Sequence, residues 1–310
     1  MILSWTGVMP AITTPFTKGD EIDHEFLARH ASWQVDNGCA GVVACGSLGE
    51  GGSLSLSEKA SVFRTLVSSV GARVPVIAAV SALTTKDAIA IAHTAAGEGC
   101  RGLMVLPPYV YVGDWREMKA HVSAVINATP LPSMLYNNPI AYKVDFLPEH
   151  VAELCSESPL LEAVKESSAD VRRIAALRSL LADRLRIMVG VDDLILEAGL
   201  MGADGWVAGL VNAFPRESVE LFDLARAGAR EPALNLYKWF LPLLRMDTVP
   251  KFVHLIKAVQ AEVGMGSATL RPPRLELSGP ELAEVRTIVA SALRAREATR
   301  SAAPVTSSRL

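Results

Sequence analysis

The chain has 310 residues, half of them hydrophobic, which is enough for one large α/β domain with or without a helical addition. Its formal net charge of −3, from 30 basic and 33 acidic residues, leaves no basic stripe, so a nucleic-acid-binding protein is not indicated. We find neither a signal peptide nor an apolar run of the roughly 20 residues that cross a bilayer, so no membrane partner is expected.

Cysteine and histidine spacing gives no sign of a metal or disulfide framework. The four cysteines are scattered and show no CxxC pair, which predicts free, buried thiols in a cytoplasmic protein. The six histidines do not cluster at the spacing of metal ligands either, so we predict no metal site.

Short apolar runs alternate with longer amphipathic segments through the first 230 residues. The predicted strands cover residues 7–14, 41–45, 74–80, 102–106, 132–136, 161–165, 186–191 and 205–210. The predicted helices cover residues 23–37, 57–70, 84–96, 114–127, 148–155, 170–181, 194–201 and 215–227. Because the strands are continuous apolar runs, we expect them to be parallel and covered on both faces.

This repetition predicts an α/β fold, a (β/α)8 TIM barrel over residues 1–230. The competing fold, a doubly wound open sheet, favours a glycine-rich phosphate loop after the first strand, and residues 13–16 do not form one. Beyond residue 230, helical patterns at 231–246, 249–263 and 280–296 predict a C-terminal helical region over 231–300. Small polar residues predict a disordered tail over 301–310.

A lone lysine, Lys165, stands at the end of the sixth predicted strand, after residues 161–164, which are apolar except for Glu162. Burial in apolar surroundings lowers the pKa of an amine and favours the neutral form that a Schiff-base nucleophile needs. The alternative is an ordinary strand-end lysine that extends into solvent or pairs with Glu166.

Other strand ends add candidate site residues, because active sites of such barrels lie at the C-terminal ends of the strands. The Gly46-Ser47-Leu48-Gly49-Glu50 turn can hold a carboxylate with a hydroxyl and successive N–H groups, or it is an ordinary loop. The phenols of Tyr109 and Tyr136 can relay protons beside an amine, or they are half-buried packing residues. The remaining strand ends carry Gly190, Asp192 and Val207.

Taken together, these motifs resemble the dihydrodipicolinate synthase / N-acetylneuraminate lyase family of class I aldolases and lyases. The resemblance covers nearly the whole chain and is carried by Gly46-Ser47-x-Gly49-Glu50, Tyr136-Asn137-x-Pro139, Lys165-Glu-Ser-Ser and Gly190-x-Asp192-Asp193. It implies a (β/α)8 barrel with a C-terminal helical region, assembled as a homotetramer that is a dimer of dimers.

The resemblance also implies roles for the candidate residues. Lys165 forms a Schiff base with a 2-oxo acid, Tyr136 shuttles protons, and Tyr109 completes a proton relay across a subunit interface. The substrate carboxylate is held by Ser47 and the neighbouring backbone amides, and the keto acid lies against the backbone of Val207. The predicted substrate-binding residues are Gly46, Ser47, Leu48, Gly190, Asp192 and Val207. Beyond the covalent imine, no metal or organic cofactor is implied.

Two positions depart from the family pattern. Leu48 stands where the family loop usually carries a second hydroxyl residue, so one hydrogen bond to the substrate is lost. Ala141 stands where true dihydrodipicolinate synthases have an arginine that holds the carboxylate of the aldehyde substrate. The second departure makes a role in lysine biosynthesis the weaker interpretation.

Three further stretches look most similar to the 1-pyrroline-4-hydroxy-2-carboxylate deaminases, which degrade hydroxyproline. They are residues 5–8, residues 236–244, and residues 266–267 followed by 271–275. Deamination of that cyclic imine is therefore our first hypothesis. The alternatives are a 4-hydroxy-tetrahydrodipicolinate synthase or another pyruvate-dependent or 2-oxo-3-deoxy acid aldolase or dehydratase.

Two other classes of protein remain open. A non-catalytic barrel that binds a small molecule is possible, because a fold does not fix a function. A metal-dependent aldolase needs several convergent ligands at the strand ends, and only Asp192 and Asp193 qualify.

Overall fold

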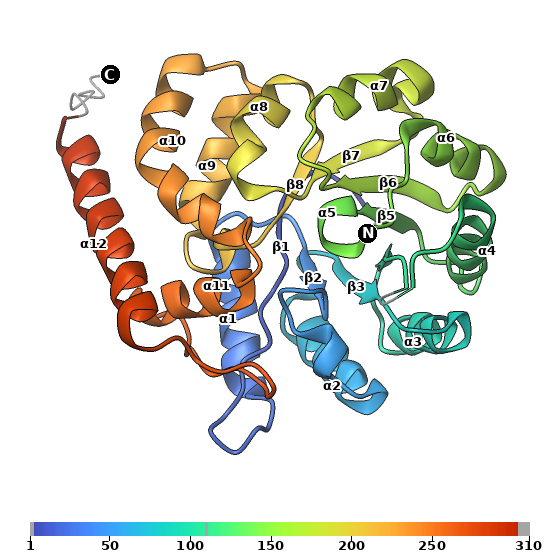
Figure 1. Ribbon diagram of the computed structural model, residues 1–310, viewed down its shortest axis with the longest axis horizontal. Helices are drawn as coiled ribbons and strands as arrows, with labels where there is room; N and C mark the ends of the chain where they lie inside the picture. Colours follow the sequence, from blue (N-terminus) through green and yellow to red (C-terminus); the bar gives the residue numbers. More distant parts are fainter. Residues whose placement is uncertain (1–2, 109–110, 303–310) are drawn as a thin grey trace.

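The computed structural model describes residues 3–108 and 111–302. Eight parallel strands form one sheet in the order β1-β8-β7-β6-β5-β4-β3-β2, surrounded by helices (Figure 1). The strands are β1 (Gly7–Pro10), β2 (Val42–Ala44), β3 (Val76–Val80), β4 (Gly102–Val105), β5 (Ser133–Asn137), β6 (Leu161–Glu166), β7 (Arg186–Val189) and β8 (Gly205–Ala208).

The two end strands of this order, β1 and β2, meet and close the barrel. A parallel bridge joins Ala11 to Val43, and the Ile12 N–H donates to the Val43 carbonyl at 3.0 Å. Nearer the N-terminal ends of the same two strands, the Ala40 N–H donates to the Val8 carbonyl at 2.8 Å. The closed barrel confirms the predicted fold and excludes the open doubly wound sheet.

The helices of the barrel follow the strands in the predicted alternation. They are α1 (His24–Asp36), α2 (Leu56–Val70), α3 (Thr85–Gly97), α4 (Trp115–Ile126), α6 (Pro148–Glu157), α7 (Arg172–Leu181), α8 (Ile195–Leu200) and α9 (Pro215–Arg226). N-terminal capping residues explain where two of these helices begin. Ser55 and Glu58 form a capping box at α2, and Asp114 and Glu117 form one at α4. One short helix, α5 (Pro139–Tyr142), has no counterpart in the prediction.

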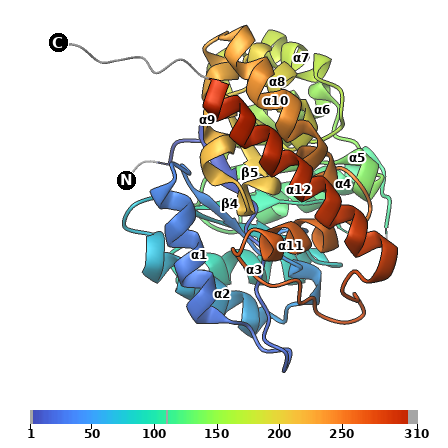
Figure 2. The same cartoon turned by 90° about the vertical axis from the view of Figure 1, so that its left-hand side faces the viewer.

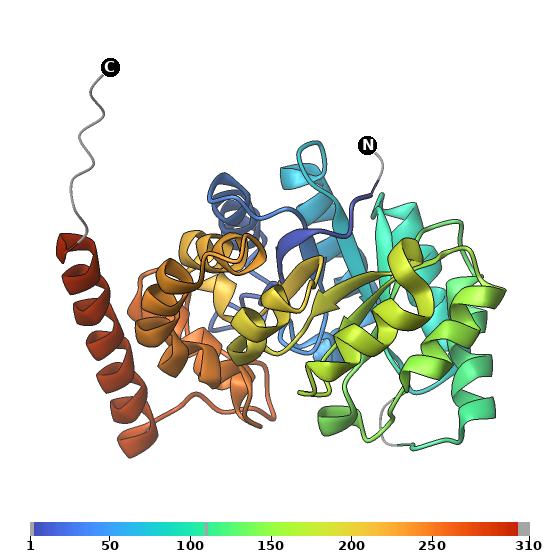
Figure 3. The ribbon, with the colours of Figure 1, turned by 90° about the horizontal axis from the view of Figure 1, so that it is seen from above.

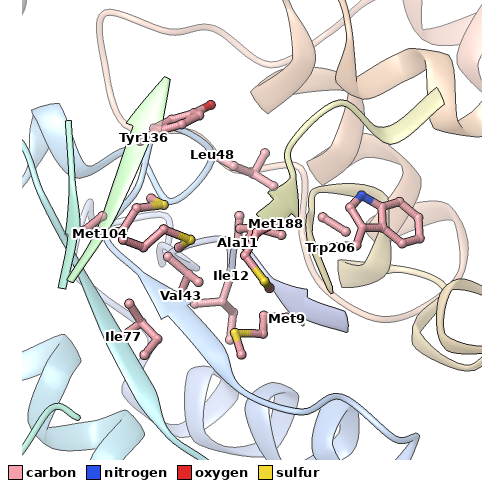
Figure 4. Close-up of a cluster of buried hydrophobic side chains, with 14 of the residues drawn as sticks. Met9, Ala11, Ile12, Val43, Leu48, Ile77, Met104, Tyr136, Met188 and Trp206 are labelled. Carbon is pink, nitrogen blue, oxygen red and sulfur yellow. The ribbon is translucent and has the colours of Figure 1, made fainter. Parts of the chain in front are cut away.

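The interior of the barrel is filled by side chains, as is typical of this fold. Figure 4 shows Met9 and Ile77 at one end of this cluster and Leu48 and Tyr136 at the other. Met104 and Met188 lie between them in the same view, and both are buried. The end that carries Tyr136 is formed by the C-terminal ends of the strands, which is where the candidate site residues were expected.

Three further helices pack on one side of the barrel, beside α8, α9 and α1 (Figures 1 and 3). They are α10 (Arg230–Leu244), α11 (Phe252–Glu262) and α12 (Gly279–Ala302). Figure 2 shows α12 crossing the outside of α10 and α11. Helix α12 continues to Ala302, so residues 301 and 302 of the predicted tail are helical. Residues 303–310 lie outside the described part, and the tail predicted there stays a prediction.

Two observations concern the predictions about free cysteines and membrane-spanning segments. The four cysteines are free and buried, as expected. Across residues 3–108 and 111–302, none of the helices combines the length and the hydrophobicity that crossing a bilayer requires.

Candidate functional site

Lys165 and Tyr136 are neighbours on adjacent strands. They pair in register between β6 and β5, and the Lys165 Nζ lies 4.3 Å from the centroid of the Tyr136 ring. Both side chains are buried, each with 6% of its surface exposed. The alternative of a lysine extended into solvent is therefore wrong, and so is pairing with Glu166, whose carboxylate accepts instead from Asn137 and the Ser168 N–H.

Gly190 provides the space that the lysine side chain occupies. A Cβ built at Gly190 would lie 2.4 Å from Lys165 Cε and 2.0 Å from the Ser167 Oγ. Only a glycine at this position leaves room for the aliphatic part of Lys165 beside β7. The predicted site residue Gly190 thus lies against Lys165, although no substrate contact follows from this geometry.

The turn that carries Ser47 is tightly folded at the C-terminal end of β2. Cys45 and Glu50 both have left-handed backbone angles, with φ of 58° and 53°. The Gly51 N–H donates to the Gly46 carbonyl at 3.0 Å, and a Cβ at Gly51 would lie 1.9 Å from the Cys45 carbonyl oxygen. The glycines therefore permit a close turn that leaves Ser47 half-buried at the barrel mouth.

A buried ion pair ties this turn to the C-terminal helices. Lys257 of α11 donates to Glu50 Oε1 at 2.5 Å, and both side chains are almost completely buried. The second oxygen of Glu50 accepts from the Arg271 N–H at 3.2 Å and lies 3.5 Å from the Arg274 guanidinium. Phe16 packs under the Lys257 ammonium at 4.6 Å. The helical region thus holds the Ser47 turn in place, which sequence patterns did not predict.

Tyr142 enters the site beside Ser47, and the sequence analysis did not identify it. Its hydroxyl is hydrogen-bonded to the Ser47 Oγ. Its ring meets the Tyr136 ring edge-on, with centroids 5.8 Å apart and planes at 81°. An available signal was Asn138-Pro139, which is typical of a helix start and caps the single turn α5 that ends at Tyr142.

Asp192 is completely buried, and both its carboxylate oxygens already have protein partners. It accepts from the Trp206 Nε1 at 3.0 Å, from the Gly209 N–H and from the Leu210 N–H at 2.7 Å. Burial raises the pKa of this carboxyl to about 6, while its hydrogen bonds and the charge of Lys165 act in the opposite direction. These contacts join the ends of β7 and β8, and a direct role in substrate binding stays a prediction.

A second buried carboxyl, Asp247, approaches the same end of the barrel from the C-terminal region. Its Oδ1 has no hydrogen-bond partner among the described residues. A Cβ at Gly209 would lie 1.9 Å from this oxygen, so the carboxyl lies directly against the end of β8. Burial, followed by the negative charge of Asp192, raises its pKa well above the usual value. Nothing in the sequence singled out Asp247, because it lies in the helical region.

The other predicted residues have the following positions. A Cβ built at Gly46 would lie at ordinary contact distance from Met104 and Ala79. Leu48 is 3% exposed in the barrel core, and Val207 is buried in β8 opposite Met9. Tyr109 lies outside the described residues, so its predicted relay stays a prediction.

Two features of the molecule bear on alternative sites. Within residues 3–108 and 111–302, no three His, Cys, Asp or Glu side chains are grouped closely enough to share a metal ion. A cavity of about 530 Å³ lies between α1, α9 and α12, but its lining includes no described residue of the predicted site.

Comparison with known proteins identifies the family. The model of the dihydrodipicolinate synthetase family matches residues 4–292. The chain belongs to this family. A 4-hydroxy-tetrahydrodipicolinate synthase from Sorangium cellulosum is 33% identical over 301 residues, covering 97% of this chain and 99% of that protein. One from Leptospira biflexa is 32% identical over 272 residues, covering 88% and 92%.

Solved structures of the dihydrodipicolinate synthetase family agree with this assignment. The 4-hydroxy-tetrahydrodipicolinate synthase from Methylacidiphilum fumariolicum has a TM-score of 0.91 at 28% identity, with 96% of this chain and 99% of that chain covered. The protein is therefore a class I aldolase-family lyase, as the resemblance implied. These relatives carry the name that the sequence analysis gave as the alternative, and the deaminase hypothesis is not confirmed by them.

Proposed function

We propose that the protein is a Schiff-base lyase that binds a 2-oxo acid covalently through Lys165. The observation that carries this proposal is the buried Lys165 Nζ, 4.3 Å from the centroid of the Tyr136 ring at the C-terminal end of the barrel. A buried amine that has no carboxylate partner among the described residues, and that lies beside a phenol, supports catalysis better than a simple binding role.

The chemistry follows from these groups. The Lys165 nitrogen adds to the carbonyl carbon, the carbonyl oxygen leaves as water, and the resulting iminium withdraws electrons from the neighbouring carbon. A proton or carbon group on that carbon then leaves more easily. Tyr136 is the candidate acid–base group for these transfers, and the Ser47 turn is the candidate site for the carboxylate. The iminium itself accepts the electrons, so the proposal needs no cofactor.

The names of the relatives favour condensation of pyruvate with an aldehyde, as in the 4-hydroxy-tetrahydrodipicolinate synthases, as the reaction. A solved dihydrodipicolinate synthase from Acinetobacter baumannii, 27% identical over 93% of this chain, is a complex with pyruvate. Deamination of the hydroxylated pyrroline carboxylate is the second candidate. It is favoured by Ala141, which is exposed and offers no guanidinium for the carboxylate of an aldehyde substrate.

Two assays separate these candidates. Pyruvate with aspartate semialdehyde tests the synthase reaction, and the cyclic imine tests release of ammonia and 2-oxoglutarate semialdehyde. Both assays use the wild-type enzyme and Lys165→Arg, which keeps a long basic side chain but replaces the nucleophilic amine. Turnover of either substrate by the wild type alone supports the proposal. Equal turnover by Lys165→Arg would remove Lys165 from the mechanism.

We also propose the homotetramer that the resemblance implies. Its support is membership in the family and the predicted relay through Tyr109 at a subunit interface. Light scattering after gel filtration measures the mass directly. A mass of four chains is expected, whereas a monomer that keeps full activity would contradict a relay between subunits.

A further inference from the structure

The Ser47 turn, residues 46–50, lacks the second hydroxyl of the family pattern, and the structure places another hydroxyl beside it. Leu48 is buried in the barrel core and offers no hydrogen bond. Ser47 is the remaining hydroxyl of the turn, and its Oγ is hydrogen-bonded to the Tyr142 hydroxyl. Tyr142 is remote from the turn in sequence, so the two hydroxyls meet only in the folded chain.

The geometry of α5 directs Tyr142 into the mouth of the barrel. Asn138 caps this single turn by accepting from the Ala141 N–H at 3.0 Å. The same side chain donates to the Tyr136 hydroxyl at 3.1 Å, which fixes α5 relative to the site. Ile140 and Ala141 are exposed, whereas Tyr142 is half-buried with its ring against Tyr136. Tyr142 is therefore the side chain of α5 that reaches the Ser47 turn.

We propose that Tyr142 binds the carboxylate of the substrate and replaces the hydroxyl donor that is missing at Leu48. This inference rests on the proposed function of the site. A carboxylate accepts up to about four hydrogen bonds, and a charged acceptor strengthens each of them. The two hydroxyls bond to each other in the structure. When the carboxylate enters, both hydroxyl hydrogens turn toward its oxygens.

The test uses the extent of imine formation, which does not depend on later steps. Pyruvate is added at increasing concentrations, the imine is reduced with borohydride, and the modified fraction is measured by mass. Tyr142→Phe is expected to raise the pyruvate concentration for half-maximal labelling by about 10- to 100-fold, the effect of losing a hydrogen bond to a charged group. Hydroxyacetone, a ketone of similar size without a carboxylate, should label wild type and variant alike.

Two further variants serve as a matched control and as a rescue in this experiment. Tyr111→Phe removes the hydroxyl of an exposed tyrosine that bonds Glu117, and it should leave pyruvate labelling unchanged. Leu48→Thr restores a hydroxyl to the turn. It should improve pyruvate labelling more in the Tyr142→Phe background than in the wild type, because only that background lacks a second donor.

The outcomes distinguish this inference from the proposed function. If the wild type gains no mass with pyruvate, the Schiff-base proposal itself fails. If the wild type is labelled but Tyr142→Phe shows the same concentration dependence, only the role of Tyr142 is overturned. Equal weakening of pyruvate and hydroxyacetone labelling, or no greater rescue by Leu48→Thr in the Tyr142→Phe background, would also overturn it.

Discussion

Gly190 lies so close to Lys165 that a Cβ at position 190 would be 2.4 Å from the Cε of the lysine and 2.9 Å from its Cγ. Real Cβ atoms do not approach carbon atoms this closely, so any larger residue at 190 must displace the lysine or β7. The position of the amine relative to Tyr136 therefore depends on the absence of a side chain on the neighbouring strand.

Gly190→Ala is expected to impair activity while the protein still folds. Overpacking typically costs about 1–3 kcal/mol of stability, and displacement of a reacting group by about 1 Å can lower the rate about 100-fold. Turnover and thermal unfolding measured together separate the two effects. Gly97→Ala is the control, because a Cβ there meets nothing within 4 Å. If Gly190→Ala kept wild-type turnover, the close packing of Gly190 against Lys165 would not be required for catalysis.

Tyr136→Phe is expected to retain imine formation and to slow the steps that transfer protons. Loss of a general acid–base group typically lowers the rate by about 10²–10⁴-fold. Borohydride trapping reports the imine, and steady-state turnover reports the later steps. Trapping should remain near the wild-type level while turnover falls. Unchanged turnover would exclude the Tyr136 phenol from catalysis.

Lys257→Met is expected to destabilise the protein strongly, because it leaves the Glu50 carboxylate buried without its ammonium partner. Breaking a buried ion pair in this way costs about 3–5 kcal/mol. Chemical denaturation measures the loss in the free energy of unfolding. Lys251→Met is the control: its pair with Glu281 is about half-exposed, so the change should stay within about 1 kcal/mol. Similar small effects for both variants would show that the buried Glu50 ion pair contributes little to the stability of the fold.

His30 is expected to make the protein less stable in mild acid. It is buried, bonds the Asn212 carbonyl at 2.8 Å, and burial lowers its pKa from 6.5 to about 4. Between these pH values the unfolded chain binds a proton that the folded protein does not. The free energy of unfolding therefore falls as the pH drops from 6.5 to 4, by about 3 kcal/mol for this group.

Denaturation at several pH values tests this expectation. His30→Gln should flatten the stability profile between pH 4 and 6.5 relative to the wild type. His93→Gln, which changes an exposed histidine, should leave the profile as it is. An unaltered slope in the His30→Gln variant would show that another group causes the acid sensitivity.

The barrel was predictable because its signals are local and repeated. Continuous apolar strands followed by amphipathic helices can form few other folds, and Lys165 and Tyr136 both fall at predicted strand ends. Strands β5 and β6 are consecutive and adjacent, as expected for a (β/α)8 barrel, whereas the register that pairs Tyr136 with Lys165 comes from the structure. Roles beyond this placement come from the family resemblance and stay predictions.

What the sequence did not reveal depends on contacts between distant segments. Glu50 and Lys257 are separated by 207 positions, and no periodic pattern connects them. Tyr142 lies in a single helical turn, which is too short to show amphipathic spacing. The N–H donors around the Asp192 carboxylate come from the end of β8 and the residues after it, so they could not be read from the residues next to Asp192. Its predicted role in substrate binding stays a prediction.

The most direct test of the central claim is to identify which residue carries the reduced imine. The wild-type enzyme is treated with pyruvate and borohydride and digested, and the modified peptide is sequenced by mass spectrometry. We predict a single adduct on Lys165, the lysine beside Tyr136. An adduct on another lysine, or an unmodified Lys165 at saturating pyruvate, would contradict the account.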